Sequence, residues 1–590
     1  MRILLLCSLL PALPCQSLVK DIHPGSGTGS LPQEFVVYGD IALFSADDGQ
    51  SGRELWRTDG TAAGTVLVKD LRPGTASSFP RLPVVAGGKV FFTADGGGTG
   101  HELWISDGTA AGTQMVADIE PGLTGGSPGP FAVFGQRVCF PATTSTYGRE
   151  LWISDGTAAG TKMVFDLLPG LGSANPSQMV QFGREFWFVA DDGPHGRELW
   201  HTDGTAAGTQ LHADLNPGTR SGFTSGTNSL TPLGATLFFA GDDGVHGTEL
   251  WKTDGTAAGT VLVKDLNPLA RVGSIVAPQR AALGLLFFEA DDGISGLELW
   301  RSDGTAAGTF LLRDILPGRS GSLFLSGMTP AQHLLYFRAD DGVNGFETWC
   351  TDGSSAGTKL TLDVNPGFGH GVINRTDMVQ LGSGQEILFA GTAPATGLEL
   401  WRSDGTAAGT TLVADLNPGS ASGEVLSNGT QARLGRWLVF SGNDGTLGIE
   451  LHRLDLARLG VPLVAEVGTG CAGTNQVVPS CSARGLPRLG EAGFAVSLQH
   501  ARAQSPAAFA LSEGRSDLAL LACTFHLAAP VFSIAHLTDG TGLAQQPLPI
   551  PNQPVLLGLE LFVQWGVKDP QGAYARSFAF SNALQLLVGQ

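Results

Sequence analysis

Pairs of adjacent acidic residues recur through the sequence, each followed by glycine in a loop-like segment. Carboxylate oxygens on a rigid loop are ligands that Ca²⁺ accepts, so these pairs are candidate calcium sites and Ca²⁺ is the one candidate cofactor. The full EF-hand spacing is absent, and aspartate also accepts backbone N–H bonds in tight turns, so a solvated turn is the alternative. The candidate ligands are Asp47, Asp48, Asp191, Asp192, Asp242, Asp243, Asp291, Asp292, Asp340 and Asp341.

Histidines form a second set of residues suited to chemistry. His195 and His246 occupy the same loop position beside two of the acidic pairs, and His201 and His212 lie nearby. Such histidines can bind a metal, whereas exposed turn histidines are the plainer interpretation. No Gly-x-Ser-x-Gly segment is present, and no unique pair of acids like that of glycosidases stands out. The sequence therefore yields no candidate catalytic residue.

A repeated motif accounts for most of these positions. The string ELWxxDGT occurs seven times, first at Glu54 and last at Glu399, with an altered copy at Glu347 and a decayed one at Glu450. Successive tryptophans of the motif are 48 to 52 residues apart, a period typical of propeller repeats rather than of helical solenoids. The third and eighth repeats have lost the acidic pair and read PATTSTYG and GTAPATG there.

Each repeat has the composition of four short strands. In one unit, β-rich runs cover 66–71, 82–85, 90–93 and 102–105, and turn residues separate them. Four strands per unit predict a propeller blade. A segment like LVKDLNPG occurs nine times, so we expect nine blades, with eight blades and a flanking hairpin, or an open solenoid, as alternatives.

The ends of the repeat region suggest how the ring closes. The chain enters the repeats with an LVKD strand and leaves them with the ELH strand, so these two can share one blade. A second closing strand is conceivable at 463–466, in LVAEVGTG.

The repeated residues suit structural roles. The tryptophan shares a strand face with the glutamate two residues before it and can fill the space between neighbouring sheets. In DGTAAGT the aspartate and threonines can bond to the loop backbone, and in DLxPG proline and glycine turn the chain. Because these residues recur in every repeat, they favour structure over catalysis.

The N-terminus predicts export. The string MRILLLCSLLPALPCQS places an apolar run after Arg2, so we expect a signal peptide over 1–17, with lipid anchoring at Cys15 as an alternative. No later stretch reaches the roughly 18 apolar residues of a transmembrane helix. In an oxidising compartment Cys471 and Cys481, ten residues apart, are the candidate disulfide pair, and the partner of Cys523 stays open.

A different composition follows the repeats. Apolar runs at 494–498, 518–527 and 556–565, and the final SFAFSNALQLLVG, read as strands of a small β-sandwich. We therefore expect an all-β chain with three parts: the signal peptide at 1–17, a large propeller of about nine (alternatively eight) four-stranded blades at 18–455, and a β-sandwich-like domain at 456–590.

The repeats also carry a family resemblance. The strings ELWRTDGTAAGT, ELWISDGTAAGT and ELWKTDGTAAGT resemble the ELWxxDGT repeat family of secreted bacterial proteins, over about residues 17–455. The resemblance implies a β-propeller-like extracellular protein and carries over no catalytic residue. The segments GTGCAGTN, LPIPNQPVLLGLELFVQW and SNALQLLVG resemble a C-terminal module appended to many secreted bacterial proteins.

Composition narrows the function. With 35 basic and 54 acidic residues the net charge is −19, which argues against a nucleic-acid partner. We expect a monomeric, secreted or cell-surface propeller without catalysis, a binding or adhesion scaffold for an extracellular glycan or protein, because a rigid ring presents many loops. The alternatives are a hydrolase or lyase acting on polysaccharide in the central funnel, which convergent unique carboxylates or histidines would favour, and a structural envelope component.

Overall fold

The computed structural model describes residues 15–589 except 26, 224–229, 269–272, 323–326, 373–377, 383, 424–425, 427–428, 462, 468–470, 473–476, 485, 514, 521–522, 529–531, 554–555 and 570–577. Of 275–278, 463, 465–467, 516–520, 523–525, 532 and 578 it describes the backbone alone. Within the described residues the regular structure is β apart from the 3-10 helix η1 (Leu456–Leu459). No helix there is long and apolar enough to cross a membrane.

The chain forms two compact units. The larger comprises Asp21–Ala432 and Phe440–Leu451, and the smaller comprises Met1–Lys20, Arg433–Val439 and His452–Gln590. Residues 1–14 of the expected signal peptide lie outside the described residues, and Gln16 and Ser17 begin strand β1 (Gln16–Lys20).

Within the part of the chain that the structure describes, nine four-stranded antiparallel sheets, called blades 1 to 9, follow one another. Blades 1 to 3 are β2 (Gln33–Tyr38), β3 (Ile41–Asp47), β4 (Arg53–Thr58), β5 (Val66–Lys69); β6 (Arg81–Ala86), β7 (Lys89–Asp95), β8 (His101–Ser106), β9 (Gln114–Ala117); and β10 (Ala132–Phe134), β11 (Arg137–Thr144), β12 (Gly148–Ser154), β13 (Lys162–Phe165). Blades 4 to 6 are β14 (Ser177–Phe182), β15 (Glu185–Asp191), β16 (Arg197–Thr202), β17 (Gln210–Ala213); β18 (Thr231–Leu233), β19 (Thr236–Asp242), β20 (Thr248–Thr253), β21 (Val261–Lys264); and β22 (Ile275–Ala282), β23 (Leu285–Asp291), β24 (Leu297–Ser302), β25 (Phe310–Leu311). Blades 7 to 9 are β26 (Thr329–Ala331), β27 (Leu334–Asp340), β28 (Phe346–Thr351), β29 (Lys359–Leu362); β30 (Val379–Gln380), β31 (Ile387–Ala393), β32 (Gly397–Ser403), β33 (Thr411–Ala414); and β34 (Gln431–Leu434), β35 (Trp437–Asn443), β36 (Ile449–Asp455) with β1.

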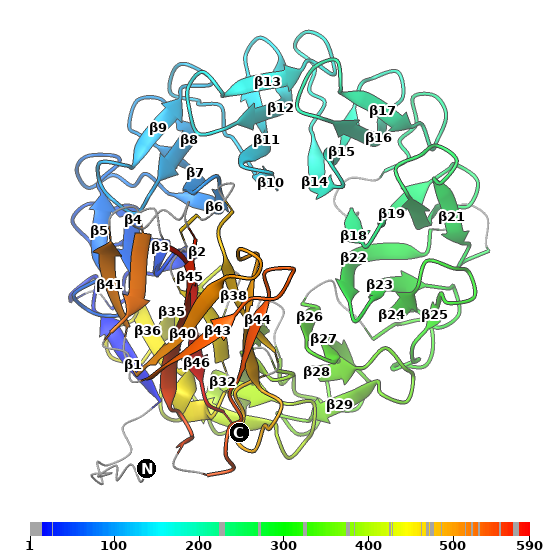
Figure 1. Ribbon diagram of the computed structural model, residues 1–590. Coiled ribbons are helices and arrows are strands. Elements are labelled where there is room, and N and C mark those ends of the chain that lie inside the picture. The colour runs from blue at the N-terminus through cyan, green and yellow to red at the C-terminus, as the bar shows by residue number, and fades with distance from the viewer. Residues whose placement is uncertain are drawn as a thin grey trace. The chain divides into compact units, whose positions relative to one another are not determined.

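The larger unit closes on itself. Leu31 donates its N–H to the Ile449 carbonyl at 3.0 Å, and Phe35 donates to the Gly429 carbonyl at 3.0 Å. Figure 1 shows blades 1 to 7 following one another along an arc, with their first strands innermost: β2, β6, β10, β14, β18, β22 and β26. In blade 9 the order is β1-β36-β35-β34, so the N-terminal strand completes the last sheet. The propeller, its nine blades and the expected closure by the LVKD and ELH strands are confirmed.

Blades pack face to face because their second and third strands are apolar on both sides. In β19 and β23 the five central residues are buried. Phe238 and Leu250 of blade 5 share one core cluster with Phe288 and Trp300 of blade 6. The tryptophan of the repeat therefore fills the space between neighbouring blades, as its recurrence predicts.

The DGTAAGT segment is a hydrogen-bonded turn. Asp59 Oδ1 accepts the Thr61 N–H at 2.8 Å and the Thr61 hydroxyl at 2.7 Å, and Gly64 donates to Thr61 Oγ1 at 3.0 Å. A Cβ at Gly64 would lie 2.1 Å from the Asp59 carboxylate, so the turn requires glycine there.

The repeated glutamate is a buried loop anchor. Glu54 is 0% exposed, and its carboxylate accepts the Leu71 N–H at 2.8 Å, the Ser78 N–H at 2.9 Å and the Ser78 hydroxyl at 2.6 Å. These bonds fasten the DLxPG loop to the third strand of the same blade. Corresponding backbone N–H groups donate to Glu102, Glu150, Glu198, Glu249, Glu298, Glu347, Glu399 and Glu450.

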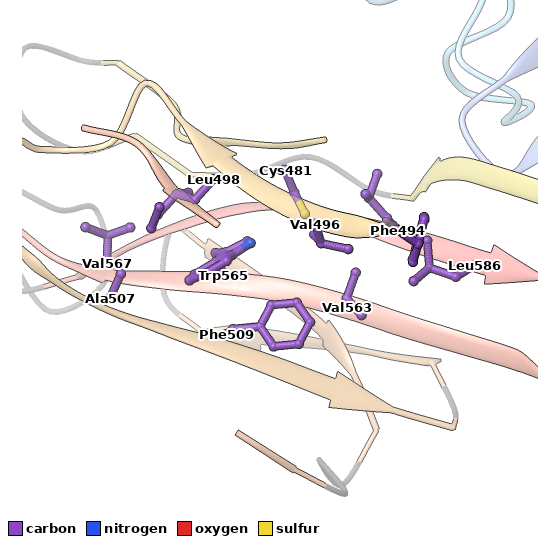
Figure 2. Close-up of a cluster of buried hydrophobic side chains, with 12 residues drawn as sticks. Cys481, Phe494, Val496, Leu498, Ala507, Phe509, Val563, Trp565, Val567 and Leu586 are labelled. Carbon is purple, nitrogen blue, oxygen red and sulfur yellow. The ribbon is translucent and has the colours of Figure 1, made fainter. Parts of the chain in front are cut away.

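The smaller unit contains a β-sandwich-like domain. A five-stranded sheet has the order β37-β46-β45-β40-β43, a three-stranded sheet has the order β38-β39-β44, and β41 pairs with β42. Side chains of both larger sheets share one core around Trp565, Phe509 and Val496 (Figure 2). The strands are β37 (Leu463–Val467), β38 (Ser480–Arg484), β39 (Ala495–Gln499), β40 (Pro506–Ser512), β41 (Arg515–Leu520), β42 (Cys523–Leu527), β43 (Phe532–Leu537), β44 (Ala544–Pro547), β45 (Glu560–Lys568) and β46 (Phe578–Leu587).

Two expectations for this region are wrong. The LVAEV segment is β37, which pairs with β46 rather than with the repeats, so it does not close the ring. Cys471 is in a disulfide, but Cys481 keeps its thiol, so the expected Cys471–Cys481 pair does not form. The reason is placement: Cys481 is buried in the sandwich core, while the Cys471 N–H bonds to the Phe580 carbonyl at 2.8 Å. The partner of Cys471 lies outside the described side chains.

Candidate functional site

The acidic pairs lie in the turns between the second and third strands. Asp191 Oδ1 accepts the Gly193 N–H at 2.7 Å, and Asp192 Oδ1 accepts the His195 N–H at 2.9 Å. In the described residues no three His, Cys, Asp or Glu gather where they could hold a metal ion. The geometry thus supports the turn interpretation. The other pairs accept the corresponding bonds: Asp47 and Asp48, Asp242 and Asp243, Asp291 and Asp292, Asp340 and Asp341.

We expect that removing divalent cations will leave the thermal unfolding of the protein unchanged. Carboxylates that already accept turn N–H bonds gain little from an added ion, and the four oxygens of one aspartate pair are fewer than the six to eight that Ca²⁺ takes. Differential scanning calorimetry with EDTA, with added CaCl₂ and with neither checks this. A rise of several degrees in Tm with CaCl₂ would restore the calcium hypothesis.

His195 and His246 belong to these turns. Each Nδ1 lies 2.7 Å from the second aspartate of its own pair, Asp192 or Asp243, and this hydrogen bond raises the pKa of both histidines. His195 precedes β16, whereas His201 lies near the other end of that strand. The histidines that are close in sequence are therefore not one group.

His201 and His212 instead meet at the opposite end of blade 4. His201 Nδ1 lies 3.2 Å from Glu185 Oε2, and the two histidine rings are 5.9 Å apart between centroids. The Trp187 ring lies 5.2 Å from that of His201 and 4.6 Å from that of His212. We call Glu185, Trp187, His201, His212 and Thr260 the histidine cluster.

Strand register produces this convergence. The turn between β14 and β15 and the turn between β16 and β17 lie at the same end of blade 4, because neighbouring strands are antiparallel. Trp187 of β15 is directly opposite His201 of β16. Thr260 comes from the DGTAAGT turn of blade 5, so the cluster joins two blades.

His212 departs from the repeat. Two residues before the DLxPG aspartate, six of the other eight repeats have valine, and the remaining two have Leu312 and Thr361. The equivalents of His201 in blades 1 and 5 are Arg57 and Lys252. Their side chains reach the next blade and donate to the Gly108 and Gly304 carbonyls at 3.1 and 2.7 Å. A column-by-column comparison of the nine repeats would have singled out His212, but not Glu185, Trp187 or Thr260, which only the fold brings beside it.

Electrostatics make His212 a proton acceptor. Burial, together with nearby His201, lowers the pKa of His212 to about 4, so its ring is neutral at neutral pH. Its Nε2 lies 2.8 Å from Thr260 Oγ1 and 3.3 Å from Thr253 Oγ1. A hydroxyl beside a neutral imidazole is the arrangement that activates an oxygen nucleophile. Thr260 Oγ1 also lies 2.9 Å from the Thr256 carbonyl, the turn bond that its counterparts in other blades make.

Comparisons with known proteins find a partial likeness to solved structures alone. No family model and no curated protein matches the chain, so the resemblance to the ELWxxDGT family stays a prediction. Among solved structures, a prolyl endopeptidase is 12% identical with a TM-score of 0.35, over 71% of this chain and 54% of that one. A puromycin hydrolase is 14% identical with a TM-score of 0.33, over 81% and 60%. The β-propeller domain of the Trilobed protease from Pyrococcus furiosus is 11% identical with a TM-score of 0.28, over 57% and 98%.

These neighbours bear on the expected function. The chain spans 54% to 60% of the prolyl endopeptidase and the puromycin hydrolase, and at such identity the likeness concerns the fold. The solved structures found are those of hydrolases and peptidases, which goes against the expectation of a non-catalytic scaffold that binds a glycan or protein. The all-β class and the propeller architecture are the part of the comparison that this chain shares.

Proposed function

We propose that the chain takes part in hydrolysis by acyl transfer, the reaction class of peptide and ester cleavage, at the histidine cluster. The observation that carries the proposal is the 2.8 Å contact between His212 Nε2 and Thr260 Oγ1. The lowered pKa of His212 supports it, since a neutral imidazole is needed to accept the hydroxyl proton.

The groups of the cluster divide the reaction between them. As Thr260 Oγ1 attacks the carbonyl carbon of the substrate, His212 Nε2 takes the hydroxyl proton and returns it to the leaving group. Water then attacks the acyl-threonine ester, with His212 again accepting the proton, and Thr260 is regenerated with release of the acid. Glu185 Oε2 lies 3.2 Å from His201 Nδ1 and so holds that ring beside His212, where its other nitrogen can donate a hydrogen bond to the carbonyl oxygen of the substrate.

Glycoside hydrolysis fits this site less well than acyl transfer. Glycosidases use two carboxyl groups, one of them protonated as a general acid. Glu185 is one carboxylate of the cluster, and Asp254 is the other acid near His212. Asp254 accepts the Thr256 N–H and hydroxyl at 2.9 and 2.7 Å, and these bonds lower its pKa. A carboxyl group held ionised in this way cannot serve as the acid.

The substitution His212→Val separates catalysis from folding. Valine stands at this strand position in six other repeats, so we expect the Tm of the variant to be equal to or higher than that of the native chain. Hydrolysis of a p-nitrophenyl ester and of a chromogenic peptide amide should fall about 100-fold or more, because a general base contributes roughly 10²–10⁴-fold. Thr260→Val should cause a similar loss.

Thr309→Val is the matched control. Thr309 in blade 6 is the equivalent of Thr260 in blade 5. The residue of blade 5 that is equivalent to His212 is Val263, so Thr309 has no histidine partner at that position. The control therefore removes the same turn hydroxyl without touching the cluster, and its activity should equal that of the native chain. Full hydrolysis by His212→Val, or equal losses in Thr260→Val and Thr309→Val, would refute the assignment.

We propose further that the chain is exported. The apolar run after Arg2 and the disulfide of Cys471 support this, since disulfides persist in oxidising compartments. N-terminal sequencing of the protein recovered from culture medium tests it, with a mature start near Leu18 as the expected result. Recovery from the cytoplasm with Met1 or Arg2 intact would contradict export.

A further inference from the structure

A groove of about 480 Å³ opens between blades 2 and 3. One wall is the DLxPG-type loop of blade 2, which supplies Glu120. The other is the turn of blade 3 that lacks the acidic pair, which supplies Ser145 and Tyr147. Trp152 and Met163 of blade 3 also line the groove. The volume lies in the range of sites that hold small ligands.

Two aromatic side chains are accessible to solvent in this groove. Trp152 is half-buried, whereas Trp56 and Trp104, at the same position in blades 1 and 2, are 6% and 7% exposed. Tyr147 is 42% exposed at the edge of the groove. The groove therefore offers two aromatic rings and the Met163 thioether to a ligand from solvent.

A fixed negative charge accompanies these rings. Glu120 Oε2 accepts the Ser145 N–H at 2.9 Å, which holds the carboxylate beside the groove and lowers its pKa. Glu120 occupies the variable third position of the DLxPG-type segment, and in the nine repeats it is the one acidic residue there. The residues at that position in the other repeats are His23, Arg72, Leu168, Asn216, Asn267, Leu316, Asn365 and Asn417.

We propose that this groove binds an organic ammonium cation. Aromatic rings attract a cation through their electron-rich faces, and an ionised carboxylate adds a direct charge attraction. Met163 and the rings together accommodate the alkyl part of such a ligand. An anion would meet Glu120 at close range, and a neutral apolar ligand would leave its charge unused. The assignment is independent of the chemistry of the histidine cluster.

Isothermal titration calorimetry on the full chain tests the charge directly. Choline is compared with 3,3-dimethyl-1-butanol, which has the same shape without the charge. We expect choline to bind about 5- to 30-fold more tightly, the range that cation–aromatic attraction provides. A second pair, N-acetyl-lysine amide and N-acetyl-norleucine amide, shows whether the groove also accepts the ammonium group of a peptide.

Variants locate the binding. Glu120→Gln keeps an oxygen for the Ser145 N–H but removes the charge, and Tyr147→Ala removes one ring, so each should weaken choline binding about 5-fold or more. Trp401→Phe is the matched control in blade 8, where the pair is also lost but Asn365 and Thr396 replace the acid and the tyrosine. It should bind choline normally. Equal affinity for choline and its neutral isostere, unchanged affinity in Glu120→Gln, or no binding of either cation would overturn the proposal.

Discussion

Replacing a single repeated glutamate, as in Glu54→Ala, will destabilise the larger unit by about 3–5 kcal/mol. The substitution leaves the Leu71 and Ser78 N–H groups and the Ser78 hydroxyl without their acceptor in a fully buried place. Each stranded donor costs about 1–3 kcal/mol, and the space left by the side chain adds to that. Urea unfolding followed by tryptophan fluorescence measures the loss.

Two further variants separate the causes. Glu54→Gln has nearly the same shape but turns an NH₂ group toward the N–H donors, so it should lose part of the stability that Glu54→Ala loses. Glu513→Ala removes an exposed glutamate and should change the unfolding free energy by less than about 0.5 kcal/mol. A Glu54→Ala protein with native stability would show that water replaces the carboxylate without cost, and the anchor role would be abandoned.

This anchor marks a limit of sequence reasoning. From the sequence, the glutamate of the ELW motif is predicted only to share a strand face with the repeated tryptophan. Nothing in the motif indicates that the glutamate is buried. Its partners come 17 and 24 residues later in the chain, on a loop whose return to the strand depends on the blade being formed. The turn residues Asp59 and Gly64 could be assigned from sequence because their bonds are local, within five residues.

The same distinction explains the other outcomes. The nine blades and their closure follow from counting repeats and from the phase at which they begin and end. The histidine cluster needs the register of β15 against β16 and the contact of Thr260 from the next blade, which no spacing within one repeat contains. The expected Cys471–Cys481 pair fails for a related reason, because a ten-residue separation does not reveal that Cys481 points into the sandwich core.

The buried glutamates also predict an unusual dependence of stability on pH. Burial is the main cause that raises their pKa values above the ordinary value of 4.5, against the opposing effect of the N–H donors. Between pH 4.5 and the raised value, each glutamate binds more protons in the folded chain than in the unfolded chain. The free energy of unfolding therefore falls as pH rises through this window, by about 1.4 kcal/mol for each tenfold difference in proton affinity between the folded and unfolded forms of one group. The pKa is raised to about 7 in Glu54, Glu150, Glu198, Glu249 and Glu399 and to about 8 in Glu347.

We accordingly expect a higher Tm at pH 5 than at pH 8, opposite to the behaviour of proteins whose carboxylates are stabilised in ionised form. The raised pKa values of His195 and His246 act in the same direction, while the lowered pKa values of His101 and His212 act against it. The six buried glutamates outnumber these two histidines. Calorimetry between pH 5 and 8 at constant ionic strength measures the slope. The slope should be smaller in Glu54→Gln, which has one titrating group fewer. A Tm that rises from pH 5 to 8 would mean that the N–H donors outweigh burial, with the glutamates ionised throughout the range.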